Sequence, residues 1–117
     1  MINKQTISSL LSKMTDNNKN NLKLIEKFFG TLNYRDSDNQ TILHILADNK
    51  YDETKCFLAI RSLLVNGLNP NTLADFNYNF IQTALYAGYS ENFILSIINE
   101  SLKTLLFFLY ELLYMNQ

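Results

Sequence analysis

Apolar residues recur in this chain at intervals of three and four, in short windows separated by polar connectors. This spacing places the apolar residues on one face of an α-helix, whereas a half-buried β-strand needs strict alternation, which no window sustains. The sequence therefore predicts an all-α fold of paired short helices. Four of the stripes are Ile7, Leu10, Leu11 and Met14; Leu22, Ile25, Phe28 and Phe29; Phe57, Ile60, Leu63 and Leu64; and Phe93, Ile94, Ile97 and Ile98.

The connectors are rich in asparagine rather than in glycine and proline. The 117 residues include 16 Asn but only three Gly and one Pro, so Asn must form many of the turns. Residues 15–21, Thr-Asp-Asn-Asn-Lys-Asn-Asn, are interpreted as a loop between helices at 4–14 and 21–29. Hydrophobic residues make up 47% of the chain and are evenly spread, which argues against a disordered Asn-rich segment.

The connectors also show an internal repeat. Residues 33–41 align with residues 71–79 at an offset of 38, and both stretches begin with Asn and lead into an apolar helix. Both carry Asn at the seventh position, as Asn39 and Asn77. A recurring unit of this length is typical of helical repeat proteins, in which each unit packs on its neighbours.

Residues 41–47 carry a more specific resemblance. Their sequence, Thr-Ile-Leu-His-Ile-Leu-Ala, shares Thr41, Leu43 and His44 with the Thr-Pro-Leu-His-x-Ala signature of the ankyrin repeat family, with Ile42 in place of Pro and Ala47 at its end. Residues 63–71, Leu-Leu-Val-Asn-Gly-Leu-Asn-Pro-Asn, resemble the end of the family's second helix and its exit turn. Residues 79–88 match less well, with Gln82 where His is usual. The chain thus resembles ankyrin repeats over about residues 31–100.

The resemblance implies an ankyrin-like helical repeat solenoid of about three helix pairs plus a C-terminal apolar helix. We expect a single domain, 1–117, in which residues 1–30 form a degenerate N-terminal capping helix pair and 31–100 form two ankyrin-like repeats. Residues 101–117 form the C-terminal apolar helix. The period of 38 exceeds the family's 33, and the extra residues are expected between Ala47 and Phe57. The candidate core residues are Leu43, Leu46, Leu63, Leu64, Ile81, Ala84, Ile97 and Ile98.

Charge and composition exclude several function classes. Ten basic and eleven acidic residues give a formal net charge of -1, so there is no excess positive charge for phosphates and we expect no nucleic-acid partner. One cysteine forms no internal disulfide, and one cysteine with one histidine does not make a zinc site, so no metal and no cofactor is expected. The N-terminus lacks the apolar stretch of a secretory signal. We expect a cytoplasmic protein, or one secreted into a host cell if it comes from an intracellular pathogen.

The reactive residue types do not form a catalytic pattern, and we expect no enzyme activity. His44 is interpreted as structural, with its ring bonded to Thr41 or to turn backbone at the start of a helix. Cys56 precedes an apolar helix and is interpreted as a buried, inert thiol. The connector carboxylates are interpreted as solvated turn residues and helix caps, because their spacing matches no metal site. These carboxylates are Asp36, Asp38, Asp48, Asp52 and Glu53.

The resemblance also implies a binding surface. In ankyrin repeats the turn tips and the exposed side of the first helices form a concave surface that binds proteins. The matching positions here are Arg35, Asp36, Ser37, Asp48, Asn49, Leu73, Ala74, Asp75, Phe76 and Tyr86. Four tyrosines lie on or near these segments, and Tyr suits such a surface because it gives large contact area at low entropy cost. The alternative is that Tyr34, Tyr78, Tyr86 and Tyr89 pack against neighbouring repeats.

The C-terminal segment, residues 101–114, departs from the repeat pattern. Its composition predicts a helix with apolar side chains on nearly all sides, whereas a terminal capping helix has a polar outer face. Its longest apolar run, Leu105–Tyr114, is interrupted by Glu111 and is about half as long as a membrane span. Three explanations remain open: the helix packs across a second subunit, it lies on a membrane surface, or the chain is part of a longer repeat protein. A missing basic face disfavours the membrane.

We therefore expect a protein–protein interaction module that presents turn tips and first-helix side chains to a partner protein. The alternative is a structural or oligomerisation module that dimerises through the apolar helix, Leu102–Tyr114. A third option is a regulatory segment of a larger enzyme. The richness in Asn, Ile, Lys and Tyr is similar to that of ankyrin-like proteins of intracellular bacteria and large viruses, many of which act on host proteins.

Overall fold

The computed structural model describes residues 2–115, and these residues form six α-helices and one 3-10 turn, with no strand among them. The all-α prediction is confirmed. Met1, Asn116 and Gln117, which belong to the expected terminal segments, lie outside the described residues. The elements are α1 (Lys4–Ser12), α2 (Asn18–Phe29), α3 (Ile42–Asp48), α4 (Glu53–Val65), η1 (Asp75–Asn77), α5 (Phe80–Ala87) and α6 (Glu91–Met115).

Helices α1, α3 and α5 begin in the same way and at the same interval. Each starts 38 residues after the previous one, and in each the residue before the helix and the third helical residue bond reciprocally. Such a capping box satisfies backbone N–H groups that a helix start leaves without partners. The 38-residue period, visible in the sequence only from residue 33, therefore reaches back to the N-terminus. The three pairs are Asn3 with Thr6, Thr41 with His44, and Asn79 with Gln82.

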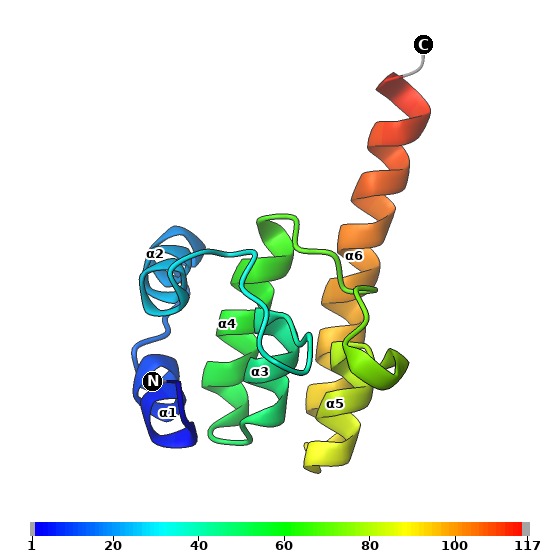
Figure 1. Ribbon diagram of the computed structural model, residues 1–117. Coiled ribbons are helices and arrows are strands. Elements are labelled where there is room, and N and C mark those ends of the chain that lie inside the picture. The colour runs from blue at the N-terminus through cyan, green and yellow to red at the C-terminus, as the bar shows by residue number, and fades with distance from the viewer. Residues whose placement is uncertain (1, 116–117) are drawn as a thin grey trace.

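The helices pack in two layers. Helix α4 lies between α2 and α6, and α3 packs against α5 (Figure 1). Helix α3 also contacts α4, and α5 contacts α6. The helix pairs α3–α4 and α5–α6 are therefore each held together across the two layers. Helix α1 departs from this order because its neighbours are α2 and α4.

The core lies between these layers and contains the expected residues. Leu43, Leu46, Leu63, Leu64, Ala84 and Ile97 are buried, whereas Ile81 and Ile98 are partly buried and pack against the core. Asn21 is also fully buried, and its amide bonds both backbone groups of Thr15 and the Ser62 hydroxyl. This one asparagine therefore fastens the connector between α1 and α2 onto α4.

Three helix boundaries differ from the expected ones. Helix α1 ends at Ser12 rather than at residue 14. Helix α2 begins at Asn18 rather than at residue 21, because the Asn17 side chain accepts from the Asn20 N–H and caps the helix earlier. The expected boundary between residues 100 and 101 is not a break: α6 is one helix from Glu91 to Met115. No Gly or Pro lies between these residues to end it.

Helix α6 is the longest element and gives the molecule its shape. Its first half packs against α4 and α5, and its second half projects beyond the other helices, with the C-terminus at the far tip (Figure 1). The described residues measure 48 × 29 × 29 Å along their principal axes. The apolar segment of the sequence is thus the exposed half of a helix that the core anchors.

Candidate functional site

Two loops lie at the same end of the helix pairs and bond to each other. The first tip loop (residues 30–41) precedes α3, and the second tip loop (residues 66–79) precedes α5. The backbone N–H of Asp75 donates to the Asp38 carbonyl at 3.1 Å. The guanidinium of Arg35 donates to the carbonyls of Asn39 at 3.0 Å and Leu73 at 3.3 Å. The structure therefore places Arg35 beside Leu73 and Asp38 beside Asp75, so that the two tip loops lie against each other.

The first tip loop is closed by its own hydrogen bonds. Asp36 Oδ1 accepts from the N–H groups of Asp38 at 3.0 Å and Gln40 at 2.8 Å. Asn39 has φ 61°, and Asn77, its counterpart in the second tip loop, has φ 64°. Asn adopts this left-handed conformation more readily than other side-chain-bearing residues, which explains the recurring Asn of the repeat. Asp36 thus serves the turn, as the connector carboxylates were interpreted to do, and its predicted contact with a partner stays a prediction.

His44 joins the start of α3 to the second tip loop. Its Nδ1 accepts from the Thr41 N–H at 3.2 Å and lies 2.8 Å from the Thr41 hydroxyl, so the proton is on Nε2, which donates to the Tyr78 carbonyl at 2.8 Å. The ring is buried, and burial lowers the pKa of His44 below its ordinary value of 6.5, opposed by the bond to Tyr78. The expected structural role is confirmed: the ring bonds both Thr41 and turn backbone.

Exposed aromatic rings gather on the second tip loop and at the end of α5. Phe76 is 89% exposed and Tyr86 is 78% exposed. Tyr78, which the predicted surface omits, packs edge-on against Tyr86 with ring centroids 5.6 Å apart. Its tip-loop position, directly before the Asn79 cap, was the signal that could have placed it there. Leu73 is exposed as well, whereas Tyr89 is buried.

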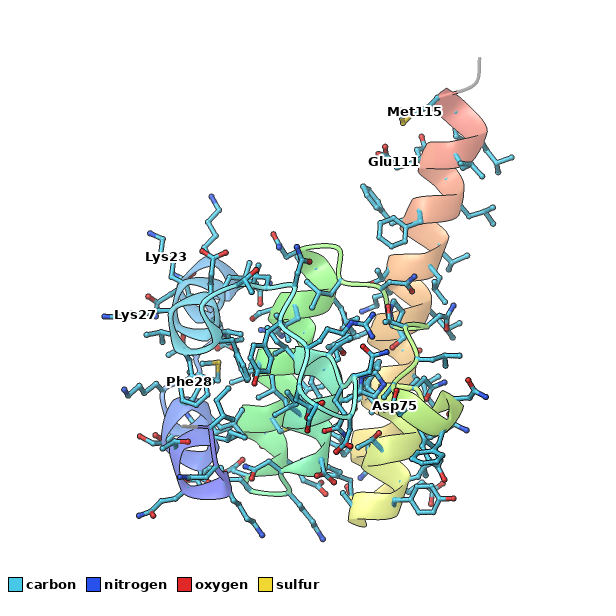
Figure 2. All side chains as sticks on the ribbon, in the orientation of Figure 1. Lys23, Lys27, Phe28, Asp75, Glu111 and Met115 are labelled. Atoms are coloured by element: carbon cyan, nitrogen blue, oxygen red, sulfur yellow. The ribbon has the colours of Figure 1, made fainter. Side chains whose placement is uncertain are left out.

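The remaining predicted surface residues divide into exposed and buried. Ser37, Asp48 and Asp75 are exposed, and Figure 2 shows Asp75 near α5, far from the lysines of α2. Asn49 is only 5% exposed, and its amide nitrogen lies 3.4 Å from the Ser8 hydroxyl of α1. Asn49 therefore joins helices inside the protein and is not available to a partner, because α1 covers it. The sequence pattern did not show that the first helix pair reaches this position.

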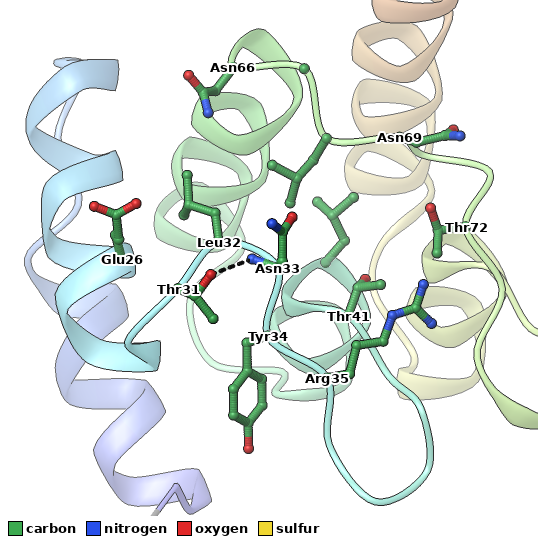
Figure 3. A pocket seen from close by; sticks show the side chains of 13 residues that line it. Glu26, Thr31, Leu32, Asn33, Tyr34, Arg35, Thr41, Asn66, Asn69 and Thr72 are labelled. Atoms are coloured by element: carbon green, nitrogen blue, oxygen red, sulfur yellow. Dashed lines mark hydrogen bonds between the residues drawn. The ribbon is translucent and has the colours of Figure 1, made fainter.

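A polar groove borders the first tip loop. It has a volume of about 680 Å³ and lies between the end of α2, the first tip loop and the turn after α4 (Figure 3). Its two charged groups, Glu26 and Arg35, lie on opposite sides, so they form no acid–base pair. The lining offers hydrogen-bonding groups and no nucleophile beside a base. It consists of Glu26, Thr31, Leu32, Asn33, Tyr34, Arg35, Thr41, Leu43, Asn66, Gly67, Leu68, Asn69 and Thr72.

Cys56 is fully buried, as predicted. Burial raises the pKa of its thiol to about 12, and the Sγ lies 3.4 Å from both the Leu46 carbonyl and the Tyr89 hydroxyl. A protonated, inaccessible thiol is a poor nucleophile. Within residues 2–115, no group of three or more His, Cys, Asp or Glu side chains lies together as metal ligands do.

The projecting half of α6 is the other exposed feature. Among the described residues, α6 is the one helix long and apolar enough to cross a membrane by length and composition, with a mean hydropathy of 1.5 over its best window and 22% of that window buried. The run Leu105–Tyr114 was expected to be too short to span a membrane. In the structure this run is the end of a longer helix, so its own length is not the length of the helix. Comparison with protein-family models, with curated proteins and with solved structures gives no match for this chain.

Proposed function

We propose that the chain is a small ankyrin-like repeat protein that binds another protein through its tip loops and the exposed ends of its first helices. The 38-residue recurrence of capped helix starts supports a repeat architecture. The bonds from Arg35 to Leu73 and from Asp75 to Asp38 support a rigid surface, because they hold one loop against the next. A rigid surface loses little conformational entropy when a partner binds.

The proposal rests on the strained backbone and the exposed ring of Phe76. Its φ of 65° lies in the left-handed region, which costs a bulky residue on the order of 1–2 kcal/mol, and its ring is 89% exposed. Neither the conformation nor the exposure contributes to folding. Strain of this kind concentrates at functional sites. A large exposed ring is suited to fill a pocket on a partner.

The neighbouring side chains fit a protein partner better than a small ligand. We define the tip surface as Arg35, Ser37, Asp48, Leu73, Asp75, Phe76, Tyr78 and Tyr86. It combines exposed aromatic and aliphatic groups with a few charges of both signs, as protein interfaces do. Its side chains are exposed, whereas small-molecule sites enclose most of their ligand. Its function requires no chemical step.

The test is capture of partners from a displayed proteome library by two variants of the full chain. The first changes Asp48, Phe76 and Tyr86 to Ala, three exposed side chains of the tip surface. The control changes to Ala the exposed Lys23 and Lys27 of α2 (Figure 2) and the exposed Val65 at the end of α4. We expect the control to retain the proteins that the unaltered chain captures and the tip-surface variant to lose them. Retention by the tip-surface variant, with an unchanged circular dichroism spectrum, would refute the proposal.

A further inference from the structure

A stripe of five leucines runs along α6, and each of them is more than half exposed. With Asn99, also exposed, the stripe advances in alternating steps of four and three residues, which is the heptad spacing of coiled-coil core positions a and d. Asn99, Leu106 and Leu113 then occupy position a, and the other leucines position d. We call this set the outer seam: Leu95, Asn99, Leu102, Leu106, Leu109 and Leu113.

The outer seam faces away from the rest of the protein. Ile97 and Thr104, which occupy position f on the opposite side of the helix, are buried, and the Thr104 hydroxyl donates to the Leu64 carbonyl of α4 at 3.3 Å. Glu111 continues this f row, and Figure 2 shows it on the side of α6 toward the other helices. A second helix can therefore approach the outer seam without meeting α4.

The projecting half of α6 needs a partner to be a stable helix. Helix α6 continues beyond Thr104 to Met115. In this part of the helix, Phe108 approaches the other helices, with its ring near Gly67 in the turn after α4. Helices shorter than about 12–15 residues are marginal in water, and helix stability in proteins comes mainly from packing of an apolar face. The outer seam is the face with regular spacing for such packing.

We propose that a second copy of this chain docks on the outer seam, so that two α6 helices form a parallel two-stranded coiled coil with their Asn99 side chains facing each other. The seam carries no charge, so identical seams meet without repulsion. A single Asn at position a specifies register, because only the parallel, in-register pair places the two amides together. In an antiparallel pair each amide would be buried against leucine without a partner.

The size of this interface is adequate for a dimer. Burying one leucine removes roughly 60–120 Å² of apolar surface from water, by the usual relation of area to transfer free energy. Five leucines on each of two helices then bury roughly 600–1,200 Å², a range that includes the roughly 1,000 Å² that a specific interface needs. The contact is isologous, and the two helical stacks lie on opposite sides of the coiled coil.

A membrane is the competing occupant of this helix, and the dimensions disfavour it. The eleven residues from Leu105 to Met115 span about 16 Å at the helical rise, about half of the ~30 Å hydrocarbon core. The preceding turns cannot extend the span while α4 covers them. Glu111 would also enter the apolar layer with the projecting segment. The heptad spacing of the exposed leucines has no purpose in lipid.

The first experiment is sedimentation equilibrium on the full chain with Leu106→Lys and Phe107→Lys. Both side chains are exposed on the projecting half, but only Leu106 lies on the outer seam. We expect the unaltered chain to dimerise, Leu106→Lys to weaken the dimer at least ~10-fold, and Phe107→Lys to change it less than ~3-fold. A monomeric unaltered chain, or equal weakening by both variants, overturns the proposal. So does flotation of a monomer with phosphatidylcholine vesicles.

The second experiment tests the register. Asn99→Cys is expected to form an intermolecular disulfide under mild oxidation, because facing a positions bring the two thiols together, whereas Phe107→Cys is not. The native thiol does not interfere, since Cys56 is fully buried. Equal cross-linking of both variants, or cross-linking of neither, overturns the parallel register. These variants leave the tip surface intact, so partner capture by the tip surface is tested separately.

Discussion

Removing the His44 ring should reveal how strongly one side chain couples α3 to the second tip loop. His44→Ala removes the bonds to Thr41 and Tyr78, each worth about 1 kcal/mol, and a buried ring worth about 1–2 kcal/mol. The Tyr78 carbonyl keeps its bond from the Ala74 N–H at 2.8 Å, so only the Thr41 N–H loses its acceptor. We expect a loss of about 2–4 kcal/mol in the free energy of unfolding.

His44→Gln separates the two bonds. Gln82 already occupies the corresponding position in the next repeat, where its side chain accepts from the Asn79 N–H at 2.9 Å. A Gln at position 44 can therefore cap α3 but lose the bond to Tyr78, at a cost of about 1–2 kcal/mol. Gln82→Ala is the control and should cost about 0.5–1 kcal/mol, because it removes a cap at the surface. Urea denaturation followed by circular dichroism gives all three values.

The pH dependence of stability provides an independent check. Burial lowers the pKa of His44, so the unfolded chain takes up the proton first as the pH falls below 6.5. The contribution of the neutral His44 ring to the free energy of unfolding is complete above pH 6.5. It is lost as the pH falls toward the lower pKa that His44 has in the folded protein. His44 is the only histidine, so His44→Gln should abolish the decline in stability that begins as the pH falls below 6.5. Parallel pH curves for both proteins, or equal costs for His44→Ala and Gln82→Ala, would refute this account.

Four further substitutions and reactions have defined outcomes. Phe76→Asn should raise the free energy of unfolding by about 0.5–1 kcal/mol in urea denaturation, because Asn tolerates a φ of 65° better than Phe. Asn21→Ala should lower the free energy of unfolding by about 2–4 kcal/mol, since Ser62 and the Thr15 backbone lose buried partners. Ser62→Ala should lower it by less. The hydrogen bonds from Ser90 lower the pKa of Glu53, so their stabilising effect should be lost as the pH falls below 4.5. Thermal unfolding should show this loss in the unaltered protein and not in Glu53→Gln. The thiol of Cys56 should react with a chromogenic disulfide reagent at least ~100-fold faster in denaturant than in buffer.

The helical fold was predictable because its signals are local. The three- and four-residue spacing of apolar groups indicated each helix. Gly67 follows the end of α4 in a left-handed conformation, which is common for Gly after a helix C-terminus. The structural role of His44 and the burial of Cys56 were also predictable, since each lies in an apolar helix. The structure confirms that both are buried. Their bonds to Tyr78 and Tyr89 join residues far apart in the sequence and were not predictable.

The composition of the tip surface was only partly predictable. Asn49 and Ala74 were predicted for the surface but are buried, and Tyr78 was not among the predicted positions although its ring packs against the exposed Tyr86. Asn49 is the clearest case: its amide meets Ser8 of α1, forty-one residues away in sequence. A pattern that marks a helix end as exposed contains no information about which other helix covers it.

Local sequence indicates the helices, their apolar faces and the turns that need Asn, because these features depend on side chains within about one helical turn. Which apolar faces find a partner depends on how the helices assemble. The side of α6 that carries Ile97 and Thr104 is buried, whereas its leucine stripe remains in solvent, although both are apolar enough to pack. Burial depends on the position of α4 and α5 and not on the hydrophobicity of α6, so the exposed leucines became recognisable as a surface only after the helices were assembled.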